Sequence, residues 1–187
     1  AREAEALKAK AQAFFSDPAY RRRLETKDLR RRFGIGYIEQ KDYGKVLRLL
    51  KQLAARQQLD PSDAVWLQSR GYDYWTDAVA CAWHELEAEA LEILWHRSGD
   101  AWQAVNASAH WRKADLPDKA IAISLEALAN ERLNPKLQSA LHTTFGGALR
   151  DVRRLTDAKS EGQKAMALTP NDFRPYTLLG AISMEEG

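Results

Sequence analysis

The sequence predicts an all-α fold, a solenoid of antiparallel helix hairpins. Three observations carry this prediction: small residues recur at nearly even intervals, helix terminators recur between them, and no segment shows the alternation of a strand. The small residues follow one another at steps of 37, 37, 38 and 34, and we call them the small-residue series: Gly34, Gly71, Ser108, Gly146 and Gly180. A period in the thirties is typical of stacked helical hairpins, because no single hairpin can bury its own apolar face. We expect all five members of the series at close helix crossings.

Helix terminators follow the first four members of the series after 27, 28, 27 and 24 residues, at Asp60-Pro61, Ser98-Gly99, Asn134-Pro135 and Thr169-Pro170. Glycine accommodates a left-handed cap and proline prevents continuation of a helix. The terminators therefore divide the chain into four units and a partial fifth: 27–62, 63–100, 101–138, 139–172 and 173–187.

A second relation repeats within the units. Twelve and nineteen residues after each of the first four series members stand Val46 and Leu53, Trp83 and Ala90, Ala120 and Ala127, and Ala158 and Ala165. The step of seven residues keeps both members of a pair on one helix face, and the small ones let two helices cross closely.

These residues carry a resemblance to the tetratricopeptide-repeat family over roughly residues 27–187. The unit from Ser139 matches best, with Phe145, Gly146, Leu149, Ala158, Ala165 and Pro170. The second unit departs from the pattern, because bulky Trp83 stands where a small residue is expected. The resemblance implies a right-handed superhelix of about four to five repeats, whose first helices line a concave groove.

Both ends resemble interrupted repeats. Ala6, Ala13 and Pro18 repeat the closing half of a unit, so residues 1–18 resemble the second helix of a preceding repeat, and residues 19–26 read as a basic connector. At the other end, residues 184–187 stop where another second helix would begin. We therefore expect a fragment of a longer array.

Composition argues against several classes of protein. The 28 Lys and Arg residues nearly balance 26 Asp and Glu, so the net charge of +2 gives no global attraction to nucleic acid or to a membrane. No stretch is apolar enough for a membrane span, no secretory signal opens the sequence, and the single cysteine, Cys81, suits a reducing compartment. We therefore expect a cytoplasmic protein without membrane insertion.

Catalytic chemistry has little support in the sequence. The four histidines form neither a His-Glu-x-x-His pair nor a zinc-type cluster with cysteine: His84, His96, His110 and His142. Gly34-Ile35-Gly36 lies within a helical pattern and not after a strand, so it does not read as a phosphate loop. We expect no enzyme activity, no metal and no cofactor.

Binding chemistry is better supported. The family resemblance places these candidate partner-binding residues in the concave groove: Arg31, Gln68, Tyr72, Trp75, Trp102, Asn106, Arg112, Lys113, Arg150 and Arg174. It places Ile35 and Ile38 there as well. Aromatic, amide and guanidinium groups suit an extended or helical peptide that bears acidic groups, and one asparagine amide, as at Asn106, both donates to and accepts from a peptide backbone. The sequence therefore predicts a noncatalytic scaffold for a protein or peptide partner. The cationic clamp that chaperone adaptors use for a terminal carboxylate is missing, because only Asn106 fits it.

Two alternatives remain open at this point. A basic run beside Tyr20 can bind the phosphates of a nucleic acid, through Arg21, Arg22, Arg23, Arg30 and Arg32. The chain can also be the recruiting or regulatory arm of a larger enzyme. All six tryptophans lie between residues 66 and 111; we expect Trp83, Trp95 and Trp111 in the core, and Trp75 or Trp102 in the groove.

Overall fold

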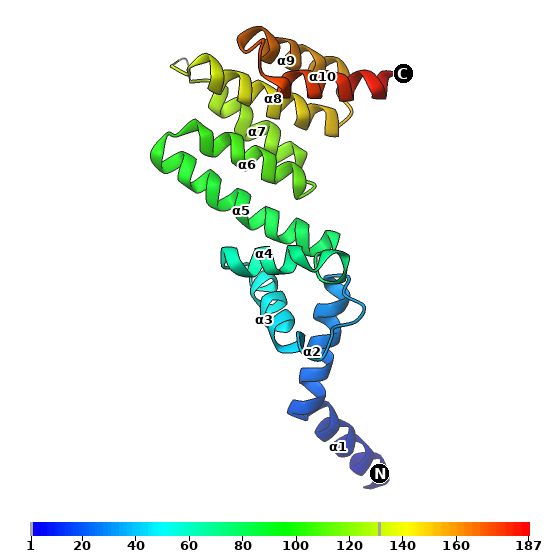
Figure 1. Ribbon diagram of the computed structural model, residues 1–187. Coiled ribbons are helices and arrows are strands. Elements are labelled where there is room, and N and C mark those ends of the chain that lie inside the picture. The colour runs from blue at the N-terminus through cyan, green and yellow to red at the C-terminus, as the bar shows by residue number, and fades with distance from the viewer. Residues whose placement is uncertain (1, 131) are drawn as a thin grey trace. The chain divides into compact units, whose positions relative to one another are not determined.

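A computed structural model describes residues 2–130 and 132–187, and these residues form α-helices, one short 3-10 helix and no strand (Figure 1). The all-α prediction is thus confirmed. The chain divides into two compact units, an N-terminal unit that ends at Val79 and a C-terminal unit from Ala80 to Gly187. Among the described residues, no helix combines the length and the apolar character needed to cross a membrane.

The N-terminal unit consists of α1 (Arg2–Ser16), α2 (Pro18–Arg32), α3 (Tyr43–Ala54), α4 (Pro61–Ser69), the 3-10 helix η1 (Gly71–Asp73) and the start of α5. Aspartates begin two of these helices: the Asp17 side chain accepts from the Ala19 amide, and that of Asp60 from the Ser62 amide. Each aspartate is followed by a proline, which is favoured in the first turn of a helix because its missing N–H is not needed there. The Asp60-Pro61 terminator therefore also starts the next helix.

The core of the N-terminal unit joins α3 to the segment that precedes it. Leu49 and Leu50 are fully buried, as is the rest of the apolar stripe of α3, formed by Val46 and Leu53. Phe33, Ile35 and Ile38 from residues 33–42 are also buried. The two isoleucines are therefore core residues, and their predicted place in a groove is wrong.

Residues 33–42 form a loop, whereas the repeat pattern predicts a first helix there. Gly34 has φ +66°, and the Ile35 amide donates to the Arg30 carbonyl, so α2 closes with a left-handed cap. Helix α2 runs through residues 19–26, which the sequence suggested as a connector. The helix that was expected to begin near residue 27 thus begins at Pro18 and ends at Arg32.

The C-terminal unit holds most of α5 (Asp77–Ser98), followed by α6 (Ala101–Lys113), α7 (Pro117–Leu128), α8 (Pro135–Asp151), α9 (Leu155–Leu168) and α10 (Phe173–Glu186). Helix α5 ends at Ser98 with Gly99 at φ +69°, as its terminator predicts. The first helix of each following hairpin, α6, α8 and α10, is capped at its N-terminus. The caps are Asp100, Asn134 and Asp172, whose side chains accept hydrogen bonds from backbone amides. The ends of α5 and α9 and the starts of α6, α8 and α10 thus follow the punctuation of the sequence closely, whereas α7 already ends at Leu128.

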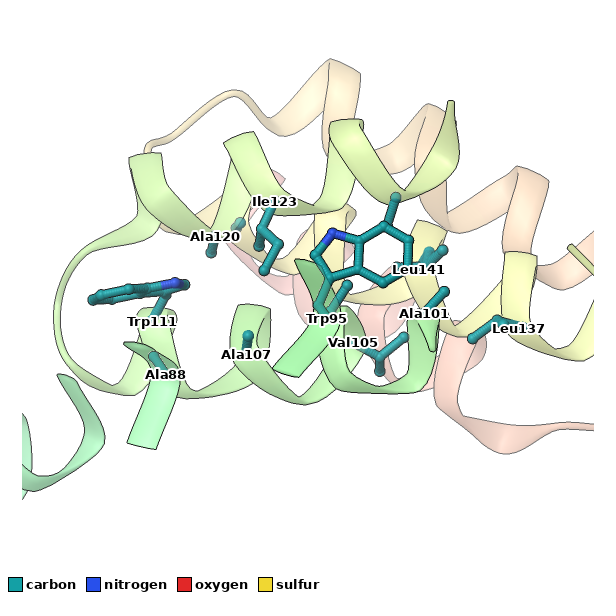
Figure 2. Packing of buried hydrophobic residues seen from close by; sticks show 13 residues of the cluster. Ala88, Trp95, Ala101, Val105, Ala107, Trp111, Ala120, Ile123, Leu137 and Leu141 are labelled. Atoms are coloured by element: carbon teal, nitrogen blue, oxygen red, sulfur yellow. The ribbon is translucent and has the colours of Figure 1, made fainter. Parts of the chain in front are cut away.

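Helix α8 is central to the C-terminal unit, since it contacts α6, α7, α9 and α10. Figure 2 shows the larger apolar cluster, where α5 to α8 meet around Trp95 and Trp111. Both indoles are buried, at 8% and 1% exposure, as predicted. A smaller cluster joins α8, α9 and α10 through Phe145, Leu149, Ala158, Leu178 and Ile182.

The small-residue series has different roles in the two units. Ser108 is fully buried where α6 meets α7, and its hydroxyl donates to the Ala120 carbonyl oxygen at 3.3 Å. A Cβ on Gly146 would lie 2.7 Å from Leu178 Cδ2 and 3.1 Å from the Ala158 carbonyl oxygen. These two positions are close helix crossings, as predicted.

The other series members are not at helix crossings. Gly34 has φ +66° and lies in the turn after α2, and Gly71 has φ +55° and begins η1. A Cβ on Gly180 would meet no heavy atom within 4 Å. The prediction that all five mark close crossings is therefore wrong at these three positions.

Candidate functional site

Five of the predicted binding residues lie on α6 and α8 of the C-terminal unit: Trp102, Asn106, Arg112, Lys113 and Arg150. Because α6 contacts α8 directly, the exposed side chains of these two helices form one surface. We call this surface the α6–α8 face. Arg174 lies in the first turn of α10 and pairs with Asp172 instead.

At the C-terminal ends of α6 and α8, the α6–α8 face contains a charge-assisted pair between the two helices. Arg112 Nε donates to Asp151 Oδ2 at 2.6 Å, and Nη2 donates to Oδ1 at 3.1 Å. This is the two-pronged geometry that gives guanidinium–carboxylate pairs their directionality. Ala109 and Lys113 complete an open cleft of about 360 Å³ beside the pair.

Gly147 makes this arrangement possible. A Cβ added there would collide with the guanidinium of Arg112, whose atoms are its nearest neighbours. The absence of a side chain on α8 therefore gives Arg112 a path across the helix to Asp151. The sequence analysis did not identify Gly147 or Asp151.

The ion pairs continue from Asp151 toward the end of α10. Arg150 lies 3.8 Å from Asp151 and 3.4 Å from Glu185, and Arg153 lies 2.6 Å from the other oxygen of Glu185. The two predicted arginines, Arg112 and Arg150, are thus already paired with carboxylates. An acidic ligand on this face would have to exchange with Asp151 or Glu185.

Trp102 and Asn106 extend the face along α6. They are four residues apart, so both side chains project from the same side of the helix. Asn106 is exposed, and the Trp102 side chain is 38% exposed, which is high for an indole. Of the two tryptophans proposed for the groove, Trp102 is the more exposed, since Trp75 is half-buried.

The remaining predicted groove residues lie in the N-terminal unit. Arg31 and Gln68 are exposed, and Tyr72 is 91% exposed and lines a cleft of its own. Each unit therefore presents its own subset of the predicted residues.

The basic residues of the nucleic-acid alternative are spread around α2. Arg21 Nε donates to the Phe15 carbonyl oxygen at 3.2 Å, Arg30 Nε donates to that of Ile35 at 3.4 Å, and the Arg32 guanidinium lies 5.3 Å from the centre of the Phe33 ring. Arg22 and Arg23 line a shallow cleft of about 280 Å³ together with Lys51 and other residues of α2 and α3. Successive helical residues point in different directions, so Arg21, Arg22 and Arg23 do not share one strip.

Two histidines face each other across α5 and α6. The Nδ1 atoms of His84 and His110 are 3.1 Å apart, and Trp83 packs against both rings. Burial lowers the pKa of His84 to about 4, with further contributions from the charges of His110 and Lys113. Burial also lowers the pKa of His110.

A third histidine, His142 on α8, meets a carboxylate. Its Nδ1 lies 2.6 Å from Glu161, which is buried and also pairs with Lys164 at 2.6 Å. Among residues 2–130 and 132–187, no three His, Cys, Asp or Glu side chains are grouped to hold a metal ion.

Trp83, the third tryptophan expected in the core, is half-buried beside the His84–His110 pair. Trp111 is held by polar contacts as well as by packing. Its Nε1 donates to Glu92 at 2.9 Å, and the Lys119 ammonium lies 4.0 Å from the ring centre.

Comparisons of the chain with protein-family models, with curated proteins and with solved structures found no match.

Proposed function

We propose that this chain is a noncatalytic protein-interaction module, built as a hairpin solenoid that resembles tetratricopeptide repeats. The packing of the C-terminal unit supports this architecture. First helices α6, α8 and α10 contact one another in sequence order, and Ser108 and Gly146 sit at close crossings with the second helices α7 and α9.

The α6–α8 face is the proposed peptide-binding surface. The observation that carries the proposal is that exposed Trp102 and Asn106 lie on the same helix as Lys113 and Arg112, and that Lys113 and the Arg112–Asp151 pair line an open cleft between adjoining helices. An exposed indole supplies apolar contact area, the Asn106 amide suits a peptide backbone, and Lys113 suits an acidic side chain. The partner is therefore an extended or helical segment that carries carboxylates.

Selection of peptides from a displayed random library on the full chain tests this proposal. The affinities of selected peptides are then measured by fluorescence anisotropy for wild type, Asn106→Ala, Trp102→Ala and Lys113→Ala. We expect each substitution to weaken binding about three- to thirtyfold, as for a contact worth about 1–2 kcal/mol.

Matched controls separate the face from the rest of the surface. Gln163→Ala on α9 and Lys10→Ala on α1 remove exposed amide and ammonium groups elsewhere, and we expect them to leave the affinity unchanged. Peptides that bind all variants equally would place the binding surface elsewhere. A library that yields no binder would argue against a peptide-binding function.

Nucleic-acid binding is a second candidate, favoured by the convergence of Arg22, Arg23 and Lys51 on one cleft. It predicts an affinity that falls steeply with salt, because phosphate contacts release counterions. Filter binding of a single-stranded oligonucleotide to wild type and to Arg22→Ala/Arg23→Ala tests it. Equal binding by both proteins would remove this candidate.

A further inference from the structure

The N-terminal unit contains a cleft that the proposed α6–α8 face does not use. It has a volume of about 410 Å³ and lies between the loop 33–42 and η1. The loop lines it with Gly34, Gly36, Tyr37 and Glu39, and η1 lines it with Tyr72 and Asp73. We call it the tyrosine cleft.

The two walls of the tyrosine cleft are fixed to each other by hydrogen bonds from buried or half-buried groups. The Tyr74 hydroxyl accepts from the Glu39 amide at 3.0 Å and donates to Asp42 at 3.4 Å. The Thr76 hydroxyl donates to the Phe33 carbonyl oxygen at the base of the loop. The cleft is therefore preformed, which reduces the entropy that a ligand has to overcome on binding.

Two aromatic rings of the cleft lie in solvent. Tyr37 is 74% exposed and Tyr72 is 91% exposed, although large aromatic side chains normally bury most of their surface. Neither residue stabilises the core at this exposure. Exposed tyrosines beside a preformed concavity are typical of binding surfaces, where they give contact area at a low cost in side-chain entropy.

The charge of the lining selects the kind of ligand. Its ionisable side chains other than tyrosine are the carboxylates Glu39 and Asp73, and it includes no lysine or arginine. Lys41 pairs with Glu39 at 2.6 Å and lowers its pKa, so this carboxylate is ionised at neutral pH and a cationic ligand shares it with Lys41. Gly34 and Gly36 add backbone without side chains, which leaves room near the carbonyl oxygens. Aromatic faces, carboxylates and carbonyl oxygens all attract cations.

We propose that the tyrosine cleft binds a lysine or arginine side chain of a partner peptide, with the cationic group held by Tyr37 and Tyr72 and neutralised by Glu39 and Asp73. The α6–α8 face and the tyrosine cleft then select opposite charges. This inference is independent of the function proposed for α6 and α8, because no residue is shared between the two surfaces.

Anisotropy titrations of the full chain with short labelled Gly/Ser peptides test the proposal. The probes are a peptide with two lysines, one with two arginines, one with two glutamates, and tetramethylammonium chloride as a free cation that competes. We expect the basic peptides to bind and the acidic peptide not to bind. Tyr37→Ala and Tyr72→Ala should each weaken binding of the lysine peptide about two- to fivefold, the effect of losing one exposed cation–π contact. Tyr72→Phe, which keeps the ring, should bind as wild type does.

A control variant outside the tyrosine cleft and variants of its two carboxylates test whether the cleft itself binds the basic peptides. Phe173→Ala removes a 70% exposed aromatic ring from α10 and should change nothing. Glu39→Gln and Asp73→Asn should weaken binding of the lysine peptide without creating affinity for the acidic peptide. Equal affinity for acidic and basic peptides, unchanged binding in Tyr72→Ala, or no binding at millimolar peptide would each overturn the proposal. Binding of tetramethylammonium without binding of the lysine peptide would overturn a peptide as the occupant.

Discussion

In the C-terminal unit, Ser108 and Gly146 of the small-residue series lie where two helices cross, whereas in the N-terminal unit Gly34 and Gly71 have positive φ, in the turn after α2 and at the start of η1. The spacing of the series is nearly the same in both units, yet the physical reason for a small residue differs. In one unit the neighbouring helix requires the small size, and in the other the backbone requires freedom of φ. An even spacing therefore does not by itself imply equivalent structure.

The largest expected effect comes from filling a helix crossing in the C-terminal unit. Gly146→Ala places a methyl group against Leu178 and the Ala158 carbonyl oxygen, and part of that contact is with backbone. We expect the free energy of unfolding to fall by about 1–3 kcal/mol, the usual cost of overpacking. Urea denaturation followed by circular dichroism measures it.

Gly180→Ala is the matched control, since it also adds a methyl group to a helix but meets no atom within 4 Å. It should be neutral or stabilising by up to about 1 kcal/mol, because alanine favours a helix more than glycine does. If Gly180→Ala costs as much as Gly146→Ala, the distinction between crossing and open positions fails.

Mild acid should weaken the C-terminal unit selectively, because His84 and His110, whose pKa values are lowered by burial, both lie beyond residue 79. The pKa of His84 is about 4 in the folded protein, below its ordinary value of 6.5, so the unfolded chain binds more protons between these values. Stability is therefore fully present above pH 6.5 and is lost as the pH falls toward 4. We expect a loss of about 1 kcal/mol, after allowance for solvent screening of a half-buried group.

Hydrogen exchange read by mass spectrometry at pH 7 and pH 5 resolves this loss by region, after correction for the intrinsic exchange rate. Protection of α5 and α6 should decrease more than protection of α3. His84→Asn/His110→Asn should remove most of the difference. An equal decrease in both units would contradict the assignment to this histidine pair.

A turn glycine in the N-terminal unit should give a smaller effect of a different kind. Gly34→Ala adds a methyl group that meets only Thr76 at ordinary contact distances, the shortest being 3.8 Å. The residue keeps φ +66°, which costs an L-amino acid about 1 kcal/mol. The same urea experiment measures it. Gly34→Asn should cost less than Gly34→Ala, and the reverse order would argue against a backbone origin.

Gly147→Ala should affect stability least. The added methyl group displaces the Arg112 guanidinium from Asp151, but the pair is partly exposed, and alanine favours the helix. We expect a net change within about 0.5 kcal/mol. In a double-mutant cycle, Asp151→Asn should weaken stability less in Gly147→Ala than in wild type, because only the 3.8 Å contact between Asp151 and Arg150 remains there. A full effect of Asp151→Asn in both backgrounds would show that the pair survives the substitution.

Sequence reasoning was most accurate where local chemistry decides the structure. The terminators predicted the ends of α5 and α9 and the start of α8 closely, because capping side chains, glycine and proline act within a few residues, whereas α7 ends at Leu128, ahead of its terminator at Asn134-Pro135. The prediction failed at residues 33–42, where the repeat period indicated a helix. There α2 has already ended at Arg32, and Gly34 forms its left-handed cap. There the buried side chains of Phe33, Ile35 and Ile38 belong to a loop and not to a helix stripe.

The candidate site, like the fold, was predictable only where local sequence determines it. The positions of Trp102, Asn106 and Lys113 on α6 follow from helical spacing, and their exposure agrees with it. The pairing of Arg112 with Asp151, 39 residues later, depends on how α6 and α8 pack and on the missing side chain of Gly147. Neither condition can be read from local sequence. The tyrosine cleft likewise depends on the contact between the Tyr74 hydroxyl and the amide of a loop that was expected to be a helix.

The central position of α8 has a consequence for the kinetics of folding. The helices with which α8 makes its main contacts in the described residues, α6, α7, α9 and α10, are its nearest or next-nearest elements along the chain. The chain segments that must be brought together during folding are therefore short, so little chain entropy is lost. The apolar contacts of α8 offset this loss early in folding. Low contact order of this kind is associated with folding in microseconds to milliseconds, so residues 80–187 are expected to collapse around α8.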